Sequence, residues 1–175
     1  MNYKESLPAD IFSHHIESYW DVSTAEACLS SPLELFLPTC TFNIIFTDQI
    51  YFVKTKLNSN WKVLKPGPTF IGQTSTYLYI KSDKPIKVRG VRFKPFAFAN
   101  ILKTPIFKLN DDIVALDLLF DLKPSFKSLM NQMIQAKTEL NKNQYTDELM
   151  YDLLKNTMSI DERLRAHLNL SLIHI

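Results

Sequence analysis

The chain has 175 residues, which is enough for one domain whose core needs neither a disulfide nor a metal ion. Its 46% hydrophobic and 22% charged residues are typical of a folded soluble protein. Twenty basic and eighteen acidic residues leave a net charge of +2, which provides no global field to hold a polyanion. Gly67, Gly72 and Gly90, the three glycines, lie too far apart for a dinucleotide fingerprint or a P-loop, which excludes nucleotide chemistry on either scaffold.

The first part of the chain has the two-residue period of β-strands. The alternation from Ile16 to Val22 predicts a half-buried strand. Residues 41–46 and 49–53 predict two strands joined by a tight turn at Thr47-Asp48. Strands this short, separated by Pro, Asn, Ser and Asp, favour an antiparallel barrel or sandwich over βαβ units. Weaker strand patterns cover residues 33–37, 61–64, 69–71, 76–81 and 85–93.

From Pro95 onward the apolar residues recur at helical spacing. A short helix is predicted after Pro95 and ends at Pro105. The run Leu109-Asn110-Asp111-Asp112 indicates a turn, in which Asp112 is expected to cap another short helix that continues to about Phe120. This role accounts for the two adjacent carboxylates without a catalytic function.

Three longer helices are predicted at the C-terminal end. The first extends from Pro124 to Leu140, and its apolar stripe could form either a dimerisation surface or part of the chain's own core. Thr146 is expected to open the second helix, and the capping box Ser159-Ile160-Asp161-Glu162 predicts the third. The stripe of the first helix comprises Phe126, Leu129, Met130, Met133, Ile134 and Ala136 or Leu140.

The sequence contains none of the patterns that catalysis or metal binding usually requires. The adjacent His14 and His15 would point to opposite faces of a strand, so they could not bind one metal ion together. Three scattered glycines cannot form the Gly-x-Ser-x-Gly elbow of a serine hydrolase. Cys28 and Cys40 are expected to be reduced thiols, and Cys40 precedes a strand rather than a helix N-terminus that would activate it. We therefore expect no catalytic residue, no metal site and no cofactor.

One predicted strand carries several cations. Residues 81–108 include eight basic residues and a single acidic residue. Within this segment, Lys87 and Arg89 share one face of the strand, and Arg92 lies on the other. If that other face lines a barrel, Arg92 is a buried or half-buried cation that must either pair with a carboxylate such as Glu17 or hold an anionic ligand.

Four short motifs follow one another in an order and spacing that point to one protein family. They are Glu17-Ser18-Tyr19-Trp20, Leu37-Pro38 ahead of Phe42-Asn43-Ile44-Ile45-Phe46, Phe70-Ile71-Gly72, and Gly90-Val91-Arg92-Phe93-Lys94-Pro95 with Phe98. With them, residues 10–160 resemble the N-terminal, cupin-like sensor domain of AraC-type bacterial transcription regulators. The chain departs from that family at Pro38-Thr39-Cys40, where Pro-Asp-Gly is usual, and at Phe96, where a small residue is common.

The resemblance implies an α+β fold with a cupin-like antiparallel β-barrel or jelly-roll body followed by C-terminal helices. We expect residues 1–123 to form the sensor body, residues 124–158 a helical hairpin that could support a homodimer, and residues 159–175 the beginning of a missing DNA-binding domain. The function implied is that of a cytoplasmic, non-enzymatic regulator that binds an unidentified small effector, contacts no membrane, and reaches DNA only through the missing part. For the effector site we nominate Trp20, Phe46, Tyr79 and Arg92.

Two other function classes stay open at this point. A small β-barrel enzyme would reveal itself by a metal ion or a nucleophile–base pair. A ligand-free interaction domain would show no stabilisation by any metabolite, since a bound ligand raises stability by mass action.

The last six residues, 170–175, match the translation of a transposon end used in sequencing-library preparation. We therefore expect the reading frame to be truncated by adapter sequence after Asn169. A natural apolar helix end is the alternative.

Overall fold

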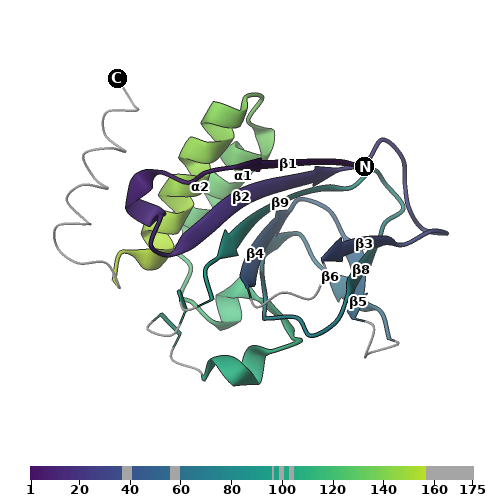
Figure 1. Cartoon of the computed structure of the whole chain (residues 1–175). Helices are drawn as coiled ribbons and strands as arrows, with labels where there is room; N and C mark the ends of the chain where they lie inside the picture. The colour runs from purple at the N-terminus through teal and green to yellow at the C-terminus, as the bar shows by residue number, and fades with distance from the viewer. Residues whose placement is uncertain (37–40, 56–59, 96, 99–100, 103–104, 157–175) are drawn as a thin grey trace.

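The computed structural model describes residues 1–36, 41–55, 60–95, 97–98, 101–102 and 105–156. In this part of the chain, ten strands form two antiparallel sheets, and two α-helices follow them (Figure 1). The α+β fold class predicted from the sequence, an antiparallel β body followed by C-terminal helices, is confirmed. The elements are β1 (Asn2–Ser6), β2 (Ile16–Ser23), β3 (Leu33–Phe36), β4 (Phe42–Thr47), β5 (Tyr51–Thr55), β6 (Lys62–Leu64), β7 (Gly67–Ile71), β8 (Leu78–Lys81), β9 (Lys87–Phe93), β10 (Ile113–Ala115), α1 (Pro124–Gln135) and α2 (Glu139–Leu154).

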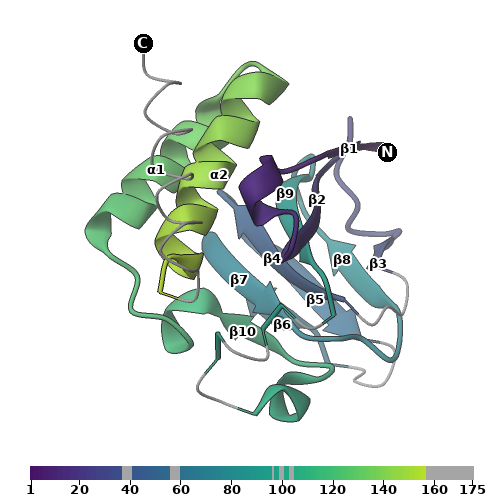
Figure 2. The same cartoon turned by 60° about the vertical axis from the view of Figure 1, so that its left-hand side comes forward.

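The described elements are arranged in three layers, with the two helices on one side of a large sheet and a small sheet on its other side (Figure 2). The large sheet has six strands in the order β1-β2-β9-β4-β7-β10, and the small sheet has four in the order β3-β8-β5-β6. On the helix side, Ile44 and Val91 pack with Phe126 in one core cluster. On the opposite side, Trp20 and Ile45 pack with apolar residues of the small sheet in a second cluster. Because both of its faces are covered, the central strand β4 is buried at all six positions.

Each strand predicted from the sequence corresponds to a strand of the structure, with small shifts at the ends. One connection differs from the prediction. β4 pairs with β7 and β9 in the large sheet, whereas β5 pairs with β6 and β8 in the small sheet. The segment at Thr47-Asp48 therefore carries the chain from one sheet to the other and does not close a pair of neighbouring strands.

The segment after Asp112 was predicted to be a short helix, and this is wrong. Residues Ile113–Ala115 form β10, which extends the large sheet by pairing with β7, and only a single 3₁₀ turn follows at Leu116–Leu118. The turn before β10 is confirmed, since Asp111 has a left-handed φ of 56° and its carboxylate accepts hydrogen bonds from the backbone N–H and the hydroxyl of Ser75, both at 2.7 Å. The short helix predicted between Pro95 and Pro105 falls partly outside the described residues.

The two C-terminal helices differ from the prediction in their limits. α1 ends at Gln135 because the backbone is already extended at Ala136, so the predicted extension to Leu140 is wrong. α2 begins at Glu139 behind the cap residue Thr138, whose hydroxyl accepts a hydrogen bond from the N–H of Asn141 at 3.2 Å. Thr146 lies in the middle of α2 and does not open it. The capping box at residues 159–162 lies outside the described residues.

The apolar stripe of α1 packs inside this chain. Met130 is 8% exposed and Met133 is fully buried, and both belong to the core cluster between the helices and the large sheet. Of the two roles left open for these methionines, the structure shows the intramolecular one. Dimerisation through this helix stays a prediction, and it would have to use the exposed polar side of α1.

Candidate functional site

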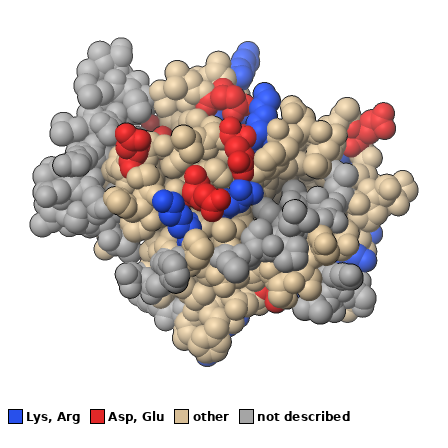
Figure 3. Space-filling model, in the orientation of Figure 1, with Lys and Arg blue, Asp and Glu red and all other residues tan. Residues whose placement is uncertain are grey.

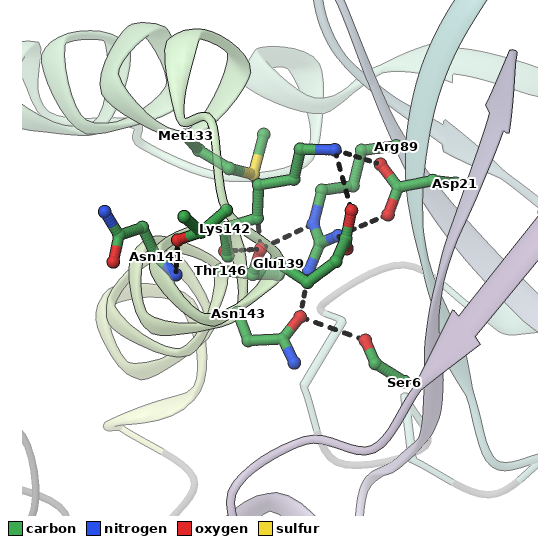
Figure 4. Close-up of polar contacts among 10 residues, drawn as sticks. Ser6, Asp21, Arg89, Met133, Glu139, Asn141, Lys142, Asn143 and Thr146 are labelled. Carbon is green, nitrogen blue, oxygen red and sulfur yellow. Dashed lines mark hydrogen bonds and ion pairs between the residues drawn. The ribbon is translucent and has the colours of Figure 1, made fainter.

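Arg89 of β9 is a nearly buried cation at the junction of the large sheet and α2, with a side chain that is 5% exposed (Figure 4). Its guanidinium donates a hydrogen bond to Asp21 of β2 at 2.5 Å. It also donates to the Thr146 hydroxyl at 2.8 Å and to the Asn143 side-chain oxygen at 2.7 Å, both on α2. Because arginine does not lose its proton in proteins, these partners are what allow the cation to be buried.

Three further charges surround Arg89, and we call Asp21, Arg89, Glu139 and Lys142 the Arg89 cluster. The Lys142 ammonium lies 3.4 Å from Asp21 and 3.3 Å from Glu139, and Glu139 lies 3.8 Å from the Arg89 guanidinium. The two cations and two anions balance. The cluster joins the first turn of α2 to two adjacent strands, since Asp21 and Arg89 are directly paired across β2 and β9.

A second polar contact holds the middle of α2 to the sheet. The Tyr19 hydroxyl donates a hydrogen bond to the Asp147 carboxylate at 2.6 Å, and the Ala9 backbone N–H donates to the same oxygen at 3.2 Å. Burial raises the pKa of Asp147, and burial together with the nearby Asp147 carboxylate raises the pKa of Tyr19 well above its ordinary value. The Arg89 guanidinium also lies 5.4 Å from the centre of the Tyr19 ring, so the Arg89 cluster and the contact between Tyr19 and Asp147 are adjacent.

A cavity of about 310 Å³ opens beside the Arg89 cluster. Its lining comes from the ends of β1, β2, β4 and β9, from the last turn of α1 and from the first turn of α2. Acidic and basic side chains lie next to one another across the middle of the face drawn in Figure 3, so charges of opposite sign are mixed there. The lining residues are Asn2, Lys4, Asp21, Val22, Ser23, Phe46, Asp48, Lys87, Val88, Arg89, Met133, Ile134, Ala136, Glu139 and Lys142.

The lining combines an apolar wall with a charged rim, which is the usual make-up of a small-molecule site. Phe46, Val88 and Met133 contribute apolar surface. Lys4 and Lys87, both exposed, contribute ammonium groups at the rim. A second hollow of about 580 Å³ lies between residues 101–102 and 119–123, the start of α1 and the end of α2. Its lining includes Asn156, which is the last described residue of the chain. We therefore base the candidate site on the first cavity.

The structure does not bring the four nominated residues together. Trp20 is buried between the two sheets, where its indole N–H donates to the Asn43 side-chain oxygen at 3.2 Å. Phe46 lies on the opposite face of the large sheet and is the one nominated residue that lines the cavity. Tyr79 is half-buried on β8, where its ring lies 6.5 Å from that of Tyr77 and its neighbours Leu78 and Ile80 are the ones that enter the core.

Arg92 lies on the face of β9 opposite to Arg89, as the alternation predicted. Its side chain is 23% exposed and donates a hydrogen bond to Glu5 of β1 at 2.7 Å and another to the Tyr3 hydroxyl at 3.2 Å. Its carboxylate partner is therefore Glu5, on a strand that the sequence did not predict, rather than Glu17. The contacts that the structure shows for Arg92 are those of an ion pair, and its contact with a ligand stays a prediction.

Sequence reasoning missed Arg89 as the central cation of the site. The alternation along β9 separates Arg89 from Arg92, but it does not tell which face receives the helices. One signal could have found it, because Asp21 lies on a predicted strand, and pairing that strand with β9 places a carboxylate directly opposite Arg89.

Within the part of the chain that the structure describes, no group of three His, Cys, Asp or Glu side chains is placed to bind a metal ion, and His14 is exposed in a turn ahead of β2. None of the helices described is both long and apolar enough to span a membrane. Cys28 is a buried free thiol, and Cys40 lies outside the described residues.

Comparison with known proteins identifies the family. Residues 4–115, from β1 to the end of β10, match the family described as DUF6597, a domain of unknown function. The chain belongs to the DUF6597 family. The matched region of this DUF6597 protein supplies both sheets and includes Asp21 and Arg89, whereas α1 and α2 follow it. No curated protein matches the chain significantly.

Among solved structures, this DUF6597 protein is similar to a cupin domain of an XRE-family transcriptional regulator from Enterobacter cloacae, with 14% identity and a TM-score of 0.39 over 54% of this chain and 96% of that one. It is also similar to ToxT from Vibrio cholerae, with 11% identity and a TM-score of 0.43 over 80% of this chain and 57% of that one. At these identities, the two likenesses describe the fold alone.

Proposed function

We propose that this DUF6597 protein is a non-enzymatic regulatory domain that senses a small effector in the cavity beside the Arg89 cluster. The observation that carries the proposal is the origin of the lining, which comes from both the large sheet and the turn between α1 and α2. An occupant of this cavity touches the sheet and the helices at once. Its binding free energy can therefore differ between two placements of the helices, which is what a sensor requires.

The Arg89 cluster supplies the coupling. Glu139 and Lys142 line the cavity and also hold the first turn of α2 to the sheet, since Lys142 pairs with Asp21 and Glu139 with Arg89. An effector that contacts Lys142 competes with Asp21 for it, and one that contacts Glu139 competes with Arg89. In either case the end of the helix is then held differently. A ligand shifts the equilibrium between two placements of the helices only by its difference in affinity for them. Side chains that both bind the ligand and hold the helix make that difference large.

The proposal includes the AraC type of regulator, a cytoplasmic location and DNA binding through a C-terminal module, all of which rest on the sequence motifs that resemble that family. Genomic sequence beyond Asn169 tests this part. We expect codons for two helix-turn-helix units there. Reads that confirm Ile175 followed by a stop codon would contradict the truncation and, with it, the C-terminal DNA-binding module.

A thermal-shift screen against small metabolites tests the sensor function itself. An effector present at 100 times its dissociation constant stabilises the native state by about 2.7 kcal/mol, which is easily measured. We expect hits with the original chain and with Gln135→Phe, an exposed position next to the cavity, but not with Ala136→Phe, whose ring would fill the cavity. The proposal is wrong if every hit stabilises Ala136→Phe equally, or if a purified chain converts any of the hits to a product.

A further inference from the structure

The small sheet carries a basic and aromatic outer face. Residues 49–82, which form β5, β6, β7 and β8, contain five lysines and not a single Asp or Glu. The net charge of +2 does not show this local excess of positive charge, because the acidic residues lie elsewhere in the sequence. A long acid-free segment with several lysines creates a local positive potential that the whole-chain balance does not reveal.

The strand register determines which side chains share the outer face. Tyr51, Val53, Leu78 and Ile80 point into the core between the sheets. The residues between them therefore point outward, and cross-strand pairing places Phe52 opposite Lys81 and Lys54 opposite Tyr79. Val63, opposite Phe52 on β6, is 56% exposed. The outward residues of this face, which we call the β5–β8 face, are Phe52, Lys54, Trp61, Val63, Tyr79 and Lys81.

Two lysines of this face gather around one indole ring. The Lys81 ammonium lies 4.4 Å from the centre of the Trp61 ring, and the Lys54 ammonium lies 4.9 Å from it. The Lys81 ammonium is also 5.5 Å from the centre of the Phe52 ring. Within the described residues, no ion pair joins Lys54 or Lys81 to a carboxylate. The register places Glu34 across from Tyr79 on β3, at the edge of the small sheet opposite to β6.

We propose that the β5–β8 face binds single-stranded nucleic acid, independently of the effector cavity. Single-stranded nucleic acid offers flat bases and phosphates in alternation, and proteins bind it with aromatic side chains on which bases stack, together with cations that follow the backbone. Half-buried Phe52, Trp61 and Tyr79 on the outer face of the small sheet supply the stacking surface. Lys54 and Lys81, which form no ion pair among the described residues, supply ammonium groups within the same area. Binding of this kind needs a local patch, not a high net charge.

Other partners fit the face less well. A membrane surface requires several apolar side chains that protrude, whereas among the six residues of this face Val63 alone is exposed and apolar, and the three aromatic residues are half-buried. A second copy of the chain would have to place the same two lysines against each other across a twofold axis, and like charges repel. A duplex keeps its bases stacked inside, so it offers phosphates to the lysines but nothing to Trp61.

Fluorescence gives a direct test because the full chain contains two tryptophans, Trp20 in the core and Trp61 on the β5–β8 face. An oligothymidylate of about 12 nucleotides, within the site sizes known for such surfaces, is titrated at low salt. We expect quenching of the emission of the original chain, and no quenching of Trp61→Phe, which keeps a stacking ring and retains only the buried Trp20 emission.

Matched variants then test the chemistry by anisotropy of a labelled oligothymidylate. We expect Trp61→Ala to weaken binding about tenfold. Lys54→Ala/Lys81→Ala should weaken it further and reduce the slope of log K against log salt by about 1.4, which corresponds to two phosphates. Lys127→Ala/Lys137→Ala removes the same charge from exposed positions on and just after α1 and should change neither value. Equal melting temperatures show that each variant is folded.

Every other outcome overturns the inference. Equal affinity for inorganic polyphosphate or duplex DNA would make the face a general polyanion surface. Binding to vesicles that contain anionic lipid, with loss on the same variants, would make it a membrane surface. Self-association that Lys54→Ala/Lys81→Ala strengthens would make it an interface between copies of the chain. If the oligothymidylate does not bind at low salt, the face does not bind single-stranded nucleic acid.

Discussion

Arg89 and Arg92 lie three positions apart on β9 and have different energetic roles. Arg89 is almost inaccessible to water and has three hydrogen-bonding partners, two of them on α2. Arg92 is partly exposed, and its partner Glu5 is 43% exposed. Exposed ion pairs contribute little because water and salt screen them, whereas removal of one partner from a buried network leaves the others without hydrogen bonds.

Alanine substitutions should separate these two roles. Arg89→Ala removes one donor each from Asp21, Asn143 and Thr146 and leaves Asp21 with Lys142 as its remaining partner. We expect it to lower the free energy of unfolding by about 3 kcal/mol. Arg92→Ala should cost about 0–1 kcal/mol. Urea unfolding of both variants measures the difference. A loss of several kcal/mol for Arg92→Ala would show that the exposed pair is structurally essential, whereas lost effector binding without lost stability would show that Arg92 contacts the ligand.

Gly90 provides the second prediction at this scale. A Cβ at this position would lie 2.0 Å from two carbons of the Trp20 indole, which is fully enclosed between the sheets. Trp20 has little freedom to move aside, because its N–H is held by Asn43. Gly90→Ala should therefore cost about 3 kcal/mol through overpacking. In urea unfolding, the double variant Gly90→Ala/Trp20→Phe should lose less stability than the sum of its single changes. Simple additivity would contradict the contact.

The sequence predicted residue positions best where a strand has one covered face. The alternation on β2 and β5 is visible, whereas β4 is buried at every position and β9 is buried on both sides near its middle. On such strands, the sequence cannot tell the helix side from the sheet side, because both need apolar residues. This is why Trp20 and Phe46 were nominated for one site although they lie on opposite faces of the large sheet.

The elements that the sequence misplaced are those whose inward side chains are polar. α2 was expected to begin at Thr146, where its apolar period begins. Its first turns instead face the site with Glu139, Lys142 and Asn143, which contact the Arg89 cluster rather than an apolar core. β1 was missed for a similar reason, since four of its five residues are exposed and it forms the edge of the large sheet.

The contact between α2 and β2 should make stability depend on pH through Asp147. Burial raises the pKa of this carboxyl above its ordinary value of about 4, so the folded chain holds its proton to a higher pH than the unfolded chain does. The stabilisation is therefore fully present below about pH 4 and is lost as the pH rises through the folded pKa. Asp147→Asn keeps an oxygen that can accept from Tyr19 and removes the titration.

Urea unfolding of the original chain and of Asp147→Asn, from about pH 4 to about pH 7, measures this effect. We expect the difference in unfolding free energy to move in favour of Asp147→Asn as the pH rises. Glu5 changes stability in the opposite direction, because its pKa is lowered, chiefly by the hydrogen bond from the Tyr3 hydroxyl. Both proteins contain Glu5, so its contribution cancels in the difference. A difference that stays constant across this range would show that Asp147 ionises equally in the folded and unfolded chains.

At the scale of the whole molecule, the helices are part of the core rather than an appendage. One cluster of buried residues combines Phe42, Phe70 and Phe93 of the large sheet with Met133 and Leu149 of the helices. The sequence suggested a sensor body over residues 1–123 and a helical hairpin over residues 124–158 that packs on the body or on a partner. The DUF6597 match ends before the helices. Without the hairpin, the aromatic face of the large sheet would be open to water.

Truncation tests whether the body can fold without the helices. We expect residues 1–123 alone to expose that face, to bind a hydrophobic dye and to lack a cooperative unfolding transition. Residues 1–156, which keep α1 and α2, should unfold cooperatively. A chain of residues 1–123 with a sharp transition and no dye binding would show that the small sheet and its own core suffice. In that case, the helices could move as a unit during signalling, and the Arg89 cluster would be the contact that holds them in place.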